Sequence, residues 1–553
     1  MRGARILAET LEDGGVEYAF GLAGSAVLGV LDEVAQCDIE FVTTRHEQVA
    51  ASMATGYALA TRRPTAVISH VGPGAANLML GVAAAYRDDI PIVAITGNEP
   101  SYRLGKGVRH EWDVIEIFER ITKHNVRMTA DRSHEQIQDA LIRSVTGVPG
   151  PVHIDIPRDL EEQDLSVPDK RERERLREKN LRAPMTHSRP PMEVVKRAMD
   201  LLTRAEQPLV IAGNEIRWFD AADDLQRFIE LTGVPVATTK NARGALSESQ
   251  PQSLGLVGRP GMELTNDYLR EADLVIAVGA RLSDITTLNW ELIDPEAAIV
   301  HATLRARELD RHYLADINAL ADPKSFLSDL NEVCEGRGVV PSFDDVASET
   351  RDDYEAAREQ FLDPKIEPAK EGVDPRKLAQ AIDRAAGKYA FTTGGGVHAH
   401  FPRRLQVESM NETFVTANFA GMSQGFPLAM GAQLALDRPV FVFEGDGGFA
   451  MVMQDLETAV REDIQVKVVV LNNSSFMSQR ARQKRYYDGR YTGSTFENPD
   501  FAAVAEEFGA FGERVMNDDE IPETVDRLIA ADGPGLLDVH IDPWLDTGGY
   551  DRD

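Results

Sequence analysis

Two oxygen-bearing side chains stand where apolar, strand-like runs end. Asp446 directly follows the run PVFVFEG. One crossover later in the chain, Asn473 directly follows the run KVVVLN. A loop, a helix and a strand fill that spacing, so adjacent parallel strands would bring both side chains to one edge of a sheet. Carboxylate and amide oxygens are ligands that suit Mg²⁺ or Ca²⁺. Gly445, Gly447 and Gly448 let backbone N–H groups approach an anion at a helix start. The sequence therefore predicts a diphosphate bridged by a divalent cation.

Short apolar strands that alternate with helical stretches must position this site. The strand-like runs are TAVIS, PIVAIT, PVHIDI, PLVIAG, DLVIAVG, PVFVFEG, KVVVLNN and GLLDVHI. Continuous apolar strands between helices indicate parallel sheets covered on both faces. We predict an α/β chain of three doubly wound parallel-sheet domains, residues 1–165, 190–337 and 372–545. Charged, proline-punctuated linkers span 166–189 and 338–371.

The bulk composition excludes several classes of partner. The 553 residues include 90 acidic and 59 basic side chains, a formal net charge of −31. This charge repels nucleic acid and anionic membranes, so neither is an expected partner. A solvating acidic surface of the halophilic kind explains it, and a specific basic partner is the alternative.

Cysteine usage and hydropathy favour a cytoplasmic protein. Two cysteines, Cys37 and Cys334, are too few for a disulfide scaffold, and the N-terminus lacks an apolar signal core. The charge-free run 64–86 contains Gly72, Pro73 and Gly74, so a strand, a loop and a helix explain it better than a membrane span.

The motif GDGGFAM followed by VVVLNN resembles the signature of thiamine-diphosphate enzymes. Over nearly its whole length the chain is similar to the acetolactate synthase (large subunit) and 2-oxo acid decarboxylase family. The resemblance implies pyrimidine-binding, central and diphosphate-binding domains, with thiamine diphosphate and Mg²⁺ as cofactors. It makes Asp446 and Asn473 the side-chain ligands of the metal, and Ser475 a ligand through its backbone carbonyl.

A second resemblance lies near the N-terminus. The segment VTTRHEQVAASMATGYALAT is similar to the family segment whose activating glutamate falls on Glu47. Such a carboxylate meets the pyrimidine ring of the cofactor and helps it to lose the proton of the thiazolium carbon. A glutamate opening a helix could equally cap it or be a surface charge. The loop SHVGPGAANL resembles the family's pocket wall near the pyrimidine and places Gly72, Pro73 and Asn77 there.

The third predicted domain holds further matches. ANFAGMSQGFPLAMGA puts Met422 where the family wedges an apolar side chain between the two cofactor rings, and Ala420 where a backbone carbonyl accepts from the cofactor amine. Taken alone, a methionine is more often core filler. TTGGGVHAHF places Gly396 and His398 beside the diphosphate, although His398 could be an ordinary loop residue.

Other segments depart from the family pattern. Arg109 and His110 replace its Phe-Gln pair, and FMSQRARQKRYYDGRY is basic where relatives are apolar and aromatic. Arg109 could hold a second anionic group of a substrate, and His110 could move a proton near neutral pH, or both could be surface residues. His70 falls near the position of a working histidine in one decarboxylase.

These features imply decarboxylation of a 2-oxo acid followed by carboligation or protonation. An acyltransferase, a carbon–carbon hydrolase and a non-catalytic regulatory subunit on the same scaffold are the alternatives. Which 2-oxo acid and which acceptor react stays open.

The central domain resembles one that holds FAD in acetolactate synthase, and Arg281 matches a nucleotide-contacting arginine. A second arginine of that pattern is replaced in SDITT, so FAD is left open but disfavoured. Because relatives assemble their sites across a two-fold interface, a homodimer or homotetramer is expected.

Overall fold

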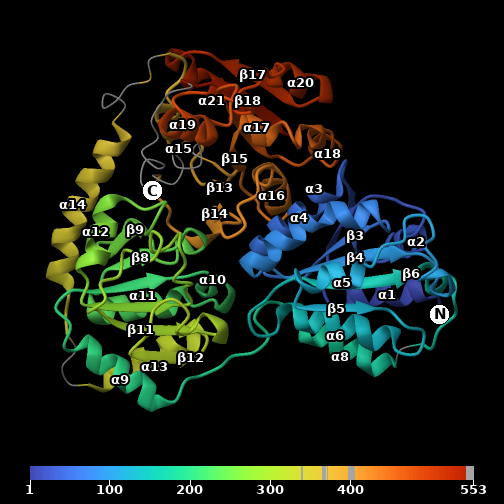
Figure 1. Ribbon diagram of the computed structural model, residues 1–553, viewed down its shortest axis with the longest axis horizontal. Coiled ribbons are helices and arrows are strands. Elements are labelled where there is room, and N and C mark those ends of the chain that lie inside the picture. The colour runs from blue at the N-terminus through green and yellow to red at the C-terminus, as the bar shows by residue number, and fades with distance from the viewer. Residues whose placement is uncertain (168, 338–340, 364–368, 370, 397–404, 543–553) are drawn as a thin grey trace. The chain divides into compact units, whose positions relative to one another are not determined.

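The computed structural model describes residues 1–167, 169–337, 341–363, 369, 371–396 and 405–542 (Figure 1). It contains three six-stranded sheets interleaved with helices, which confirms the predicted α/β class. The chain forms two compact units. The first holds Met1–Met185, Ala385–His398 and Thr416–Pro543, and the second holds Thr186–Arg384, Ala399–Val415 and Trp544–Asp553.

The first sheet of unit 1 has the order β2-β1-β3-β4-β6-β5, and all its pairs are parallel. Its order reverses between β1 and β3, and ligands of doubly wound sheets bind at such switch points. The strands are β1 (Tyr18–Gly21), β2 (Glu40–Thr43), β3 (Thr65–Ser69), β4 (Ile92–Asn98), β5 (His124–Arg127) and β6 (Val152–Pro157). The helices are α1 (Gly3–Asp13), α2 (Leu28–Val34), α3 (Glu47–Thr61), α4 (Pro73–Asp88), α5 (Val114–Glu119), α6 (Ser133–Val145), α7 (Arg158–Glu162) and α8 (Lys170–Lys179).

The C-terminal sheet has the order β14-β13-β15-β16-β18-β17, so its switch point lies between β13 and β15. The strands are β13 (Ala390–Thr393), β14 (Thr413–Phe414), β15 (Val440–Gly445), β16 (Lys467–Asn472), β17 (Phe511–Val515) and β18 (Gly535–His540). The helices are α16 (Gly425–Gln433), α17 (Asp446–Phe449), α18 (Leu456–Arg461), α19 (Met477–Tyr486), α20 (Phe501–Phe508) and α21 (Ile521–Ala530).

The sheet of unit 2 has the order β12-β11-β10-β7-β8-β9. Its strands are β7 (Pro208–Ala212), β8 (Val236–Thr238), β9 (Ser253–Leu256), β10 (Leu274–Val278), β11 (Ala298–Thr303) and β12 (Ile317–Leu320). Its helices are α9 (Met192–Leu202), α10 (Glu215–Phe219), α11 (Ala222–Thr232), α12 (Glu263–Glu271), α13 (Pro323–Gly336), α14 (Asp344–Leu362) and α15 (Pro375–Ala385). Alternate residues of β7 and β10 enter two separate apolar clusters, so both faces of the sheet are buried.

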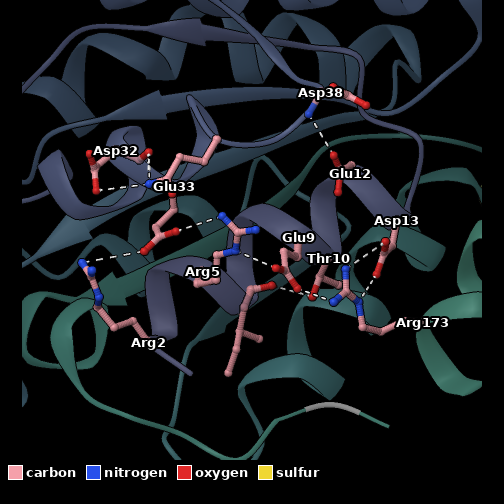
Figure 2. A network of polar contacts seen from close by, with 12 residues as sticks. Arg2, Arg5, Glu9, Thr10, Glu12, Asp13, Asp32, Glu33, Asp38 and Arg173 are labelled. Carbon is pink, nitrogen blue, oxygen red and sulfur yellow. Dashed lines mark hydrogen bonds and ion pairs between the residues drawn. The ribbon is translucent and has the colours of Figure 1, made fainter. Parts of the chain in front are cut away.

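Helix α8, which lies in the first predicted linker, is anchored to α1 by ion pairs (Figure 2). Arg173 Nε lies 2.5 Å from Asp13 Oδ2, and the same guanidinium pairs with Glu9. Glu9 also accepts from Arg5 Nε at 2.6 Å, and Arg5 reaches Glu33 of α2. The side chain of Asp13 is fully buried, so these ion pairs attach α8 to the fold and are not isolated surface contacts.

The charge-free run 64–86 forms β3 and most of α4, as predicted. Among the described residues, no helix combines the length and the apolar character that crossing a bilayer requires.

Candidate active site

The structure brings Asp446 and Asn473 together at the carboxyl ends of the neighbouring parallel strands β15 and β16. Asp446 opens α17 and is 1% exposed. Its Oδ1 accepts from the backbone N–H of Gly447 at 2.8 Å, and its Oδ2 accepts from the N–H of Asn473 at 3.2 Å. Asn473 Oδ1 accepts from the N–H and the hydroxyl of Ser475, at 3.1 and 3.0 Å. All three predicted metal ligands therefore belong to one hydrogen-bonded cluster.

The chemistry of this cluster fits a small divalent cation. The carboxylate of Asp446, the amide oxygen of Asn473 and the carbonyl of Ser475 are oxygen donors of the kind that Mg²⁺ prefers. Burial raises the pKa of Asp446 because the charged form loses water, and a bound cation would offset that cost. Within the described part of the chain, the buried Nδ2 of Asn473 has no hydrogen-bond partner, so this donor suits an anionic group beside the cation, such as a phosphate.

Sequence reasoning missed Asn498, which braces the cluster. Its Nδ2 donates to Asp446 Oδ2 at 2.8 Å and to Asn472 Oδ1 at 2.9 Å. Asn472 in turn donates to Asp538 at 2.8 Å. Asn498 lies in the coil before α20, where neither strand periodicity nor a motif marks it. These hydrogen bonds fix the orientation of the Asp446 carboxylate.

The glycine-rich turn after β13 lies at the switch point, beside β15. Gly396 has φ +115°, a backbone conformation that residues other than glycine rarely adopt. A Cβ on Gly395 would lie 3.1 Å from the carbonyl oxygen of Ala420, so this turn touches the segment that carries Met422. Ala420 is left-handed at φ +50°, and Met422 is 42% exposed. The exposure of Met422 shows that its side chain does not fill the core. His398, the other residue predicted in this region, lies outside the described residues.

Glycines of the GDGG motif also serve the packing of the chain itself. A Cβ on Gly447 would lie 2.4 Å from the ring of Phe476, and one on Gly448 would lie 2.9 Å from Glu444 Oε1. Glu444 is a further buried residue that the motif did not reveal. Its Oε2 accepts from the N–H of Phe426 at 2.9 Å, and burial raises its pKa to about 7. It secures the start of α16.

Glu47 opens α3, and the residues around it decide whether it caps the helix, is a surface charge or has the position of the activating glutamate. His46 is the N-cap, because its Nδ1 accepts from the N–H of Gln48 at 3.2 Å, so the capping role does not belong to Glu47. Glu47 Oε2 instead accepts from Asn77 Nδ2 at 2.9 Å, from the turn of helix that follows Pro73. A Cβ on Gly74 would lie 3.1 Å from Glu47 Oε1. The carboxylate is half-buried and faces the predicted pocket wall.

Arg109 and His110, which depart from the family pattern, lie with His70 beside that wall. A Cβ on Gly72, whose φ is +65°, would lie 2.6 Å from the carbonyl oxygen of His110. The rings of His70 and His110 meet edge to face with centroids 5.5 Å apart. Arg109 Nε donates to His110 Nε2 at 3.1 Å, and both residues are exposed. Arg109, His110, His70 and Gly72 thus form one cluster.

The surroundings of His70 favour the neutral form of its ring. Burial lowers its pKa, and the neighbouring His110 lowers it further. Its Nδ1 accepts from the backbone N–H of Ala26 at 3.3 Å, so the ring proton sits on Nε2.

The two sheets of unit 1 meet through α3 and α16. A Cβ on Gly56 would lie 2.1 Å from the carbonyl oxygen of Leu428, so the backbones of the two helices are in close contact at this glycine. Gln48 Nε2 donates to Ser423 Oγ. These contacts place the neighbour of Glu47 against the neighbour of Met422 within a single chain.

Family models match the chain in three consecutive stretches. Residues 1–117 match the N-terminal TPP binding domain of thiamine pyrophosphate enzymes, 195–330 their central domain, and 394–539 their C-terminal TPP binding domain. The fold and the site thus define a thiamine pyrophosphate-dependent enzyme, which confirms the class predicted from the motifs.

Curated relatives narrow the family. The chain is 32% identical to the "Probable acetolactate synthase large subunit" of Methanocaldococcus jannaschii, over 98% of this chain and 92% of the relative. It is 30% identical to the "Acetolactate synthase isozyme 2 large subunit" of Escherichia coli, over 98% and 96%. The "Acetolactate synthase large subunit" of Corynebacterium glutamicum is 30% identical, over 100% and 90%. The chain belongs to the acetolactate synthase large-subunit family.

Proposed function

We propose that the chain uses thiamine diphosphate and Mg²⁺ to decarboxylate a 2-oxo acid, and that the remaining fragment is joined to a second carbonyl or protonated. One observation carries this proposal. Glu47 with its Asn77 partner, and Asp446 with Asn473, lie in the same compact unit, and Gln48 beside Glu47 donates to Ser423 beside Met422. A chain that only kept the fold would have no use for the activating carboxylate.

The metal end holds the cofactor by its diphosphate. Asp446, Asn473 and the carbonyl of Ser475 would take Mg²⁺, whose remaining positions suit phosphate oxygens and water. The segments after β13 and β15, with Gly396, His398, Gly445, Gly447 and Gly448, would line the diphosphate. When bound, the cofactor would supply a nucleophilic carbon for the substrate carbonyl and an acceptor for the electron pair released with CO₂.

The pyrimidine end falls to Glu47. Its carboxyl would hold a proton at the pyrimidine ring nitrogen, and Asn77 would orient it through the 2.9 Å hydrogen bond. Gly72 and Pro73 would shape the wall, and Ala420 would offer its carbonyl to the exocyclic amine. The exposed Met422 side chain would pack against the cofactor rings.

The cluster of Arg109, His110 and His70 would meet the substrate. The exposed guanidinium of Arg109 suits a second anionic group by a charge-assisted contact. His70, neutral with its proton on Nε2, can donate to a developing oxyanion, and His110 can move a proton. We therefore favour a 2-oxo acid that carries a second negative charge.

The testing experiment measures CO₂ release, with product identification by mass spectrometry. Purified protein, thiamine diphosphate and Mg²⁺ are combined with a panel of singly and doubly anionic 2-oxo acids, at low and high salt. We expect turnover that depends on both cofactors and is fastest for a doubly anionic acid. Acetolactate from pyruvate as the main product would refute the charge preference. The absence of turnover with every acid would refute decarboxylation and favour acyl transfer or carbon–carbon hydrolysis.

The Glu47→Gln variant tests the catalytic role. Turnover should fall by roughly 10²- to 10⁴-fold, the range of general acid–base catalysis, while the melting temperature is retained. Glu135→Gln on α6, an exposed glutamate of the same unit, should leave turnover unchanged. Equal activity of Glu47→Gln and the unsubstituted protein would contradict the role of Glu47.

We further propose a homodimer or homotetramer that works with a small-molecule substrate, without nucleic acid or membrane. The net charge of −31 supports the two exclusions, because it repels polyanions. Light scattering at low and high salt tests the assembly, and a monomer at full activity would contradict it.

A further inference from the structure

The central sheet of unit 2 has the strand order of a dinucleotide-binding fold. Read from β9, the order β9-β8-β7-β10-β11-β12 corresponds to 3-2-1-4-5-6. In that topology a dinucleotide lies at the carboxyl ends of the first and fourth strands, here β7 and β10. The site requires glycines that let backbone approach the pyrophosphate, and a helix start that is open to it.

The ends of β7 and β10 do not offer this space. A Cβ on Gly213, directly after β7, would lie 2.2 Å from the Cα of Ala280. A Cβ on Gly279, directly after β10, would lie 2.7 Å from the Cβ of Glu215. These glycines are needed so that the two strand ends can touch each other. Atoms of the chain therefore pack directly against both strand ends.

An internal carboxylate stands where the crevice would receive a phosphate. Glu215 is the first residue of α10 and is 1% exposed. Its Oε1 accepts from Thr303 Oγ1 at 2.7 Å, its Oε2 accepts from the N–H of Leu304 at 2.9 Å, and Arg305 Nε lies 3.4 Å from Oε1. A hydroxyl, a backbone N–H and a guanidinium are the donors that bind phosphate.

We infer that Glu215 replaces the phosphate of a dinucleotide, so that the central domain is closed to FAD and the enzyme works without flavin. The carboxyl group of Glu215 satisfies the donors at the end of β11 and occupies the space that a phosphate would need. The residues at this crevice therefore do not fit FAD, although Arg281 matches the family pattern. The inference is independent of which 2-oxo acid reacts.

The full-length protein provides the direct test. Protein purified from cells supplied with riboflavin should show no flavin absorbance, and titration with FAD up to millimolar should change neither flavin fluorescence nor the melting temperature. One flavin bound per chain would overturn the inference.

Two variants test the residue itself. Glu215→Ala uncovers Thr303, Leu304 and Arg305, so inorganic phosphate should raise the melting temperature of this variant more than that of the unsubstituted protein. Glu215→Gln retains the side-chain volume and should remain closed to FAD. Glu230→Ala on α11, half-exposed, is the matched control and should respond to phosphate as the unsubstituted protein does. An equal phosphate response of Glu215→Ala and Glu230→Ala would overturn the assignment.

Discussion

At the scale of single residues, the proposed metal ligands depend on neighbouring side chains that hydrogen-bond to them. Asn498 donates to Asp446 Oδ2 and to Asn472 Oδ1, so one amide holds both strand ends in register. Partners of this kind set the orientation of a ligand and typically alter metal affinity by 10- to 100-fold. The same logic explains why Asp446, though buried, need not be strained when a cation is bound.

Replacement of Asn498 by alanine should weaken the apparent affinity for Mg²⁺ by about 10- to 100-fold without changing turnover at saturating metal. Titration of thiamine diphosphate-dependent activity with Mg²⁺ measures this. Glu497→Ala, in the exposed neighbouring position, is the control. If both variants need the same Mg²⁺ concentration, Asn498 does not position the ligand.

A second residue-scale effect concerns pH. Burial raises the pKa of Glu161 in α7 from its ordinary 4.5 to about 8, and its Oε1 has no hydrogen-bond partner among the described residues. The unfolded chain releases this proton near 4.5, whereas the folded chain keeps it to about 8. The folded state therefore binds more protons than the unfolded state in that window. The unfolding free energy consequently decreases as the pH rises through it.

The Glu161→Gln variant keeps the shape and removes the titration. Its melting temperature should fall less between pH 5 and pH 8 than that of the unsubstituted protein, a window set by the shift of Glu161 from 4.5 to about 8. Its unfolding free energy at pH 8 should be higher by on the order of 4 kcal/mol. Glu162→Gln, which is exposed, should leave the pH profile unchanged. Parallel profiles for all three proteins would contradict a buried, protonated Glu161.

At the scale of elements, strands with continuous apolar runs were predictable and short or polar strands were not. TAVIS, PLVIAG and KVVVLNN became β3, β7 and β16 almost residue for residue, because burial on both faces demands unbroken apolar sequence. Edge strands such as β5 and β17 have half-exposed residues, so no such run marks them. The charged character of residues 166–189, which contain α8, was predictable, but the ion pairs of α8 with α1 depend on tertiary contact.

The same limit applies to the candidate site. Asp446 and Asn473 follow apolar strands and were found by that position, whereas Asn498 lies in coil and was not. The residue type of Glu215 carried no signal either, because its role depends on the meeting of three strand ends. Spacing along the chain predicts contacts between neighbouring strands, but not contacts made by a distant loop.

The link between α8 and α1 can be tested as an element. Arg173→Ala leaves the buried carboxylate of Asp13 with one of its two arginine partners and should lower the unfolding free energy by about 3 kcal/mol. Lys170→Ala removes a charge from the same helix at a side chain that is 90% exposed, and should change it by less than about 0.5 kcal/mol. Chemical denaturation measures both. Equal effects would mean that α8 contributes only a solvated face.

At the scale of the whole molecule, the charge decides how the fold responds to salt. An excess of acidic over basic side chains, 90 against 59, makes the folded chain repel itself. Added salt shortens the Debye length from about 10 Å at 0.1 M to about 3 Å at 1 M, which weakens that repulsion. Ion pairs on the surface lose strength at the same time, but each contributes little. The net effect of salt is therefore stabilising.

The melting temperature should accordingly rise with KCl and then level off, because screening is nearly complete once the Debye length is shorter than the spacing between surface charges. A rise that continued in proportion to salt would instead indicate salting-out of apolar surface. The double variant Asp352→Asn, Asp353→Asn removes two exposed charges from α14 and should reduce the rise. Because the variant alters charge and leaves apolar burial intact, an unchanged salt dependence would show that repulsion between carboxylates is not what salt relieves.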